Sequence, residues 1–122
     1  QKQQIMECYE RLRKFVSDMD IEDENVYYDI RNMIEVKKIA LPTAVYKAMM
    51  NFMDQVVEPY VFEDTTEIFS EEEAKRNEKG IVEIKSEQAF QKLMVRFMEK
   101  LSELDAKIET FAESELKPYL ER

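Results

Sequence analysis

Apolar residues recur every three or four positions along most of this chain, which is the spacing of a helix that buries one face. The first such stripe consists of Ile5, Cys8, Leu12, Phe15 and Met19. A second run, 24–39, follows an acidic turn in which Asp23 suits the start of a helix. A third begins at Leu41-Pro42, because proline favours the first helical turn, and reaches Pro59. The pattern predicts three antiparallel helices of similar length.

The connection 58–85 has no clear period. Ser70 and Glu73 have the spacing of a capping box, which predicts a short charged helix that Gly80 ends. The apolar residues 81–84 fit either a strand edge or a loop that anchors on the core, and the loop is the preferred interpretation. We therefore expect an irregular acidic connection here.

A fourth predicted helix is much longer than the others. It starts after Ser86 and stops at Pro118, so it spans about 32 residues, or roughly 48 Å at 1.5 Å per residue. Its apolar stripe consists of Phe90, Met94, Phe97, Leu101, Leu104, Ile108 and Phe111. The earlier helices are each about half as long, so a bundle of that length cannot cover the whole stripe. Either 58–79 forms a second layer over its far half, or a partner covers it.

Composition supports a helical fold. Only one glycine and three prolines occur in 122 residues, too few for the many tight turns of a sheet protein. The predicted fold class is all-α, a bundle of three shorter helices and one long C-terminal helix in a single domain over 1–122. Because the chain opens on Gln1 with a helical pattern directly after it, we expect it to be part of a longer protein.

The charge pattern limits the classes of partner. The formal net charge is −9, and 37% of the residues are charged. The segments 18–29 and 63–73 each hold six acidic residues and no basic one. Nucleic-acid binding draws on clustered lysine and arginine, so no nucleic-acid partner is expected.

Residue content also excludes most catalytic machinery. The chain has no histidine, which removes the usual nucleophile–histidine systems, and a single glycine cannot build a phosphate-binding loop. Acidic residues match the ligand positions of a calcium loop at Asp18, Asp20, Glu22, Glu24 and Asp29. Asp23 stands where that loop needs glycine, so a solvated turn is preferred. We predict no enzyme activity, no cofactor and no metal site.

Two residue types at core positions have a second interpretation. Cys8 is expected to be a small buried apolar residue rather than a reactive thiol. Two methionine pairs at i,i+4, Met49 with Met53 and Met94 with Met98, are expected to fill the core. A methionine-lined groove for an adaptable partner is the alternative.

A resemblance to a family rests on the break at Ala40-Leu41-Pro42 and the run from Val45 to Phe52. Over 5–57 the chain resembles the α-helical extramembrane regions of uncharacterised bacterial single-pass membrane proteins. The resemblance implies a membrane tether upstream of Gln1, with this segment in the cytoplasm at the inner membrane face. Basic residues between Lys2 and Lys14 fit that orientation. The resemblance implies no activity and no ligand.

These observations predict a non-catalytic domain for protein interaction or oligomerisation, with the long helix as its contact element. The expected contact residues are Phe97, Leu101, Leu104, Ile108 and Phe111. The partner is a second protein or a second copy, since an antiparallel homodimer would cover the stripe. Two alternatives stay open. One is an acidic decoy that uses Glu71–Glu73 to occupy a basic site, and the other is a sensor with an apolar pocket for a small ligand.

Overall fold

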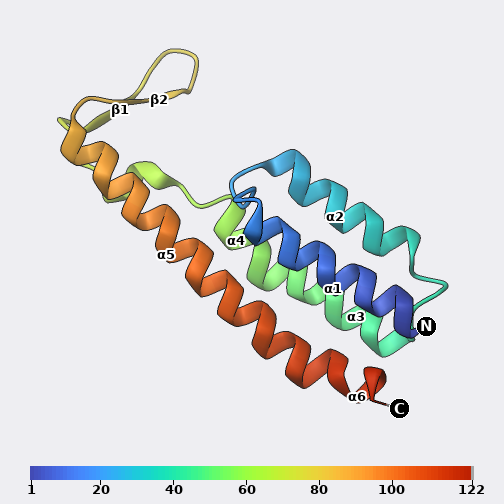
Figure 1. Cartoon of the computed structure of the whole chain (residues 1–122). Coiled ribbons are helices and arrows are strands. Elements are labelled where there is room, and N and C mark those ends of the chain that lie inside the picture. Colours follow the sequence, from blue (N-terminus) through green and yellow to red (C-terminus); the bar gives the residue numbers. More distant parts are fainter. Residues whose placement is uncertain (122) are drawn as a thin grey trace. The chain divides into compact units, whose positions relative to one another are not determined.

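The computed structural model describes residues 1–121, and they are mostly helical (Figure 1). The helices are α1 (Lys2–Ser17), α2 (Glu24–Val36), α3 (Thr43–Phe52), α4 (Glu58–Val61), α5 (Glu87–Phe111) and α6 (Lys117–Leu120). Two wide π turns, η1 (Met53–Val57) and η3 (Ala112–Leu116), and a 3-10 turn, η2 (Thr65–Ile68), lie between or beside them. The strands are β1 (Ala74–Arg76) and β2 (Val82–Ile84). The all-α fold with three shorter helices and a long C-terminal helix is confirmed. The last helix, α5 with η3 and α6, is 34 residues long.

The chain forms two compact units. The first unit comprises Gln1–Phe62 and Leu101–Arg122, and the second comprises Glu63–Lys100. The boundary falls inside α5, so this one helix contributes its N-terminal half to the second unit and its C-terminal half to the first. The single domain expected from the sequence stays a prediction.

The first unit packs α1 against α2 and α2 against α3 (Figure 1). Local signals set these helices as predicted. The Asp23 carboxylate accepts hydrogen bonds from the backbone N–H groups of Asn25 and Val26, which begins α2, and Pro42 directly precedes α3. The inward residues include Ile5, Leu12, Phe15, Ile30, Ile34, Val45, Leu104 and Ile108. Met19 leaves its predicted stripe because α1 ends before it, and its side chain is exposed.

Cys8 lies in this core with no exposed surface. Burial in apolar surroundings raises the pKa of its thiol to about 11, because the charged thiolate loses its solvation. The residue is therefore a neutral buried side chain, as predicted.

Two prolines behave differently from the prediction. Pro118 was expected to end the last helix and Pro59 to end or kink the third, but each lies within a helix that continues past it. A π turn precedes each proline, η1 before Pro59 and η3 before Pro118. Proline lacks an N–H and its ring crowds the carbonyl four residues earlier, so a wider turn accommodates it without ending the helix.

The second unit contains an antiparallel hairpin. Its register pairs Ala74 with Ile84, Lys75 with Glu83 and Arg76 with Val82. The loop preferred for 81–84 is therefore wrong, and the strand alternative holds. Ser70 N–H does donate to the Glu73 carboxylate at 3.2 Å, but the chain then enters β1 instead of a helix. Gly80, at φ +78°, turns the hairpin rather than ending a helix.

Carboxylates join the helices of the first unit. Glu7 accepts a hydrogen bond from Lys37 at 2.6 Å, and Glu109 accepts one from Tyr9 at 2.6 Å and pairs with Arg13. These hydrogen bonds lower the pKa of both carboxyl groups below their ordinary value of 4.5. Each group thus favours its charged form when the chain is folded.

We expect acid to destabilise the chain in part through these groups. A carboxyl whose pKa is lower in the folded state stabilises fully above its unfolded pKa, and this contribution is lost as pH falls through the folded pKa. The melting temperature should therefore fall between about pH 5 and pH 3. Glu109→Gln should flatten that fall, whereas Glu10→Gln, at an exposed position of α1, should not. The melting temperatures are measured by circular dichroism at each pH. If they fall equally steeply with pH in both variants, Glu109 is not the origin of the acid sensitivity.

Candidate interaction surface

The N-terminal half of α5 has an inward face within the second unit. The helix begins where the Ser86 hydroxyl accepts a hydrogen bond from Ala89 N–H at 3.0 Å, the cap expected from the sequence. Ala89 is fully buried, Leu93 and Phe97 are half-buried, and Lys100 is 1% exposed. These positions recur at the helical period and define one buried side.

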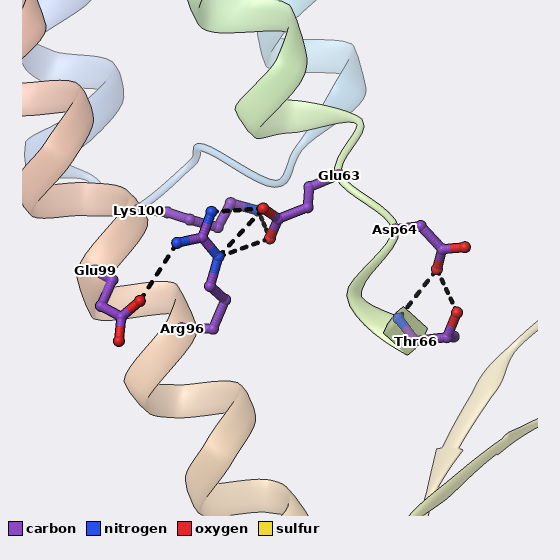
Figure 2. Close-up of polar contacts among 6 residues, drawn as sticks. All are labelled: Glu63, Asp64, Thr66, Arg96, Glu99 and Lys100. Atoms are coloured by element: carbon purple, nitrogen blue, oxygen red, sulfur yellow. Dashed lines mark hydrogen bonds and ion pairs between the residues drawn. The ribbon is translucent and has the colours of Figure 1, made fainter. Parts of the chain in front are cut away.

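Ion pairs fix this side of the helix. Arg96 donates through Nε to Glu63 Oε2 at 2.9 Å and through Nη2 to Glu63 Oε1 at 2.5 Å, a two-point contact (Figure 2). Lys100 Nζ lies 3.8 Å from the same carboxylate, and Arg96 also reaches Glu99 at 3.4 Å. The Arg96 hydrogen bonds lower the pKa of Glu63 most, and the charge of Lys100 adds to this. The planar two-point geometry restricts rotation of α5 about its axis.

A second ion pair ties α5 to the start of the hairpin. Lys92 Nζ lies 2.7 Å from the Glu73 carboxylate, which also accepts from Ser70 N–H. The hydrogen bond from Lys92 lowers the pKa of Glu73, and the Ser70 N–H contributes in the same direction. Both ion pairs therefore hold the same side of α5 inward.

The opposite side of α5 is apolar and exposed. Phe90 is 52% exposed, Met94 42%, Val95 58% and Met98 53%. We call these four residues the outer face of α5. Gln91 is uncharged and lies between them on the helix, so no charge interrupts the face. Single exposed apolar side chains are common on soluble proteins, but four on one helical face form a contiguous patch.

A shallow groove of about 400 Å³ runs along the Val95 side of this face. Its lining residues are Ile68, Gln88, Gln91, Lys92, Val95, Arg96 and Glu99. Apolar side chains from η2 and α5 thus meet amide and charged groups of both signs. Such a surface offers burial to an apolar side chain and hydrogen bonds at its rim.

The contact residues expected from the sequence lie elsewhere. Leu101 and Phe111 are 8% exposed, and Leu104 and Ile108 are fully buried. They belong to the first unit, where the ring of Phe111 stacks on Phe52 of α3 at 4.4 Å between centroids. The expectation that these four contact a partner is corrected, since their surface is already used. Phe97, the fifth expected contact residue, is half-buried in the second unit.

The methionine prediction is right for one pair and wrong for the other. Met49 and Met53 are fully buried in the first unit, as expected. Met94 and Met98 were also expected to fill the core but are exposed on α5. The three-four spacing signalled an apolar stripe in both helices, and it carried no information on which stripe is covered. The alternative interpretation, a methionine-lined groove for an adaptable partner, stays a prediction for the second pair.

Other candidate features are weaker. The acidic run Glu71–Glu73 is not a uniform acidic face, because Glu73 pairs with Lys92 and the hairpin that follows carries Lys75 and Arg76. Within residues 1–121 there is no group of three acidic or thiol side chains placed to hold a metal ion. The helices of the described chain include none that is both long and apolar enough to cross a membrane. No known protein family, curated protein or solved structure matches the chain.

Proposed function

We propose that this chain is a non-catalytic helical protein-interaction domain and that the outer face of α5 is its contact surface. One observation carries the proposal: Phe90, Met94, Val95 and Met98 are 42–58% exposed on one side of a helix whose other side is held inward by ion pairs. A contiguous apolar face of this kind typically marks a protein contact.

The chemistry of the face suits a protein surface as its partner. Fully burying a methionine or phenylalanine side chain is worth about 1.5–3 kcal/mol, and roughly half of that remains available at half-exposed positions. Methionine has an unbranched, flexible side chain, so Met94 and Met98 adapt to the shape of a partner. The ordering of the partner offsets part of this gain, which favours a modest affinity.

The tether upstream of Gln1 and the placement at the inner membrane face remain part of this proposal. Both rest on the resemblance over 5–57. The absence of catalysis rests on residue content, chiefly the lack of histidine and the single glycine.

A photo-crosslinking amino acid at Met98 tests the proposed surface in living cells. Irradiation should give a defined covalent adduct from position 98. The same amino acid at Gln55, an exposed position in η1, should give none. The Glu71→Lys, Glu72→Lys double variant should leave the adduct unchanged, whereas an acidic decoy would lose it. A chain that gives no adduct from position 98, or equal adducts from both positions, would refute the outer face as the contact surface.

A further inference from the structure

We infer that the outer face of α5 pairs with the same face of a second copy of this chain, antiparallel, about a two-fold axis near Val95. This inference rests on the proposed function and names its partner. Other surface features of the described residues are the charged hairpin tip, the apolar groove in the first unit beside Phe52 and Val56, and the exposed aliphatic pair Val36 and Ile39. None of these carries an observation that identifies an occupant.

The seam is suited to packing of two helices. Gln91, Met94 and Met98 follow one another at spacings of three and four residues, the repeat that keeps one line of a helix against a neighbour. An axis near Val95 places residues at equal distances before and after it opposite each other. The midpoint between Met94 and Met98 is one residue after Val95, so an axis at that height sets Met94 of each copy against Met98 of the other, and no charge enters the centre of the seam.

The charges beside the seam select the antiparallel arrangement. Lys92 and Glu99 are seven residues apart, so they lie on the same side of α5, two turns from each other. They are also nearly equidistant from Val95. The axis therefore sets Lys92 of one copy opposite Glu99 of the second, and this contact occurs twice. In a parallel two-fold pair this flank would face the opposite flank of the second helix, so Lys92 and Glu99 would not meet and the contact would be lost.

Both side chains are accessible for this contact. The Lys92 side chain is 53% exposed and the Glu99 side chain 56% exposed, although each has a partner within its own chain. Glu73 holds Lys92 at 2.7 Å and Arg96 holds Glu99 at 3.4 Å. These internal partners limit the side-chain freedom that dimer formation would otherwise remove.

A second copy explains the mixed rim better than a partner of opposite charge. The chain carries a net charge of −9, and a basic partner would be bound most favourably by a surface with an acidic rim. The rim of the outer face instead has one lysine and one glutamate placed symmetrically. Four half-exposed side chains offer only a few hundred Å² per copy, below the roughly 800 Å² per partner of standard interfaces. A weak dimer is expected, with a dissociation constant on the order of 10–100 µM.

Charge reversal tests the pairing in the full chain. Lys92→Glu and Glu99→Lys should each weaken self-association about fivefold or more in sedimentation equilibrium, because two contacts become repulsive. An equimolar mixture of the two variants should associate again, since one now carries acids at both positions and the other bases at both. A purely structural role for these residues predicts no gain on mixing. Circular dichroism melts of both variants check that folding is kept.

A disulfide tests the axis itself. In a Cys8→Ala background, Val95→Cys should form a covalent dimer under mild oxidation, and Gln55→Cys should not. Self-pairing is overturned if the wild-type chain stays monomeric up to about 1 mM, well above the expected dissociation constant. It is also overturned if mixing restores nothing or if only the Gln55 variant crosslinks. A monomer whose position 98 crosslinks to a different protein would refute self-pairing and leave the proposed function standing.

Discussion

Ile108→Asp should unfold the first unit. Ile108 has no exposed surface, and it lies in the half of α5 that belongs to the first unit. The substitution removes a large buried apolar side chain and places a carboxylate where nothing in the core can solvate it. The free energy of unfolding should fall by more than about 4 kcal/mol, which is comparable to the whole stability of many small domains. Far-UV circular dichroism and urea unfolding at neutral pH measure it.

Met98→Asp is the matched control on the same helix. Its side chain is 53% exposed, so the new carboxylate stays in water and the melting temperature should change by only a few degrees. The same variant should lose self-association. An Ile108→Asp chain that keeps wild-type stability would show that this part of α5 is not covered within the chain.

Glu63→Ala should be the most destabilising single change among the ion pairs of the second unit. The carboxylate is contacted by Arg96 at two points and by Lys100, whose side chain is 1% exposed. Its removal leaves two cations close together in a partly buried place. Breaking a fully buried pair costs about 3–5 kcal/mol. Because Glu63 and Arg96 keep about a quarter of their surface exposed, we expect about 2 kcal/mol, measured by urea unfolding.

A double-mutant cycle isolates the electrostatic part of this loss. Lys100→Met keeps the volume of the side chain and removes one charge, so it should recover part of the stability lost in Glu63→Ala. Glu99→Ala is the control, because this carboxylate is 56% exposed and its loss should stay within about 1 kcal/mol. Equal losses for Glu63→Ala and Glu99→Ala would contradict the central place of Glu63 in the cluster.

Local signals in the sequence were sufficient for most of the helices. Asp23 and Ser86 cap helices through hydrogen bonds to backbone groups two or three residues away, and Pro42 sets the start of α3 through its fixed backbone angle. These effects act within one turn, so the residues that cause them can be read in order. The buried stripe of α1 was predictable for the same reason, since the helical period alone places Ile5 and Leu12 on one face.

Local signals in the sequence do not predict the hairpin. Ala74 pairs with Ile84 across ten residues of sequence, and the stability of a strand comes from such cross-strand partners. The capping-box pair Ser70 and Glu73 forms its hydrogen bond, but the chain continues into β1 because pairing outweighs a weak local preference. A short apolar run such as 81–84 fits a strand or a loop until its partner is known.

The candidate surface was likewise predictable in part from the sequence and decided in part by the tertiary structure. The sequence by itself established that the long helix carries an apolar stripe longer than its neighbours can cover. Only the tertiary structure decided which half is covered: Leu104 and Ile108 are buried, whereas Met94 and Met98 are exposed. The reason is physical. The spacing of apolar residues is the same whether a helix faces its own core or a partner, so burial depends on the elements that pack beside it, and distant parts of the chain supply these.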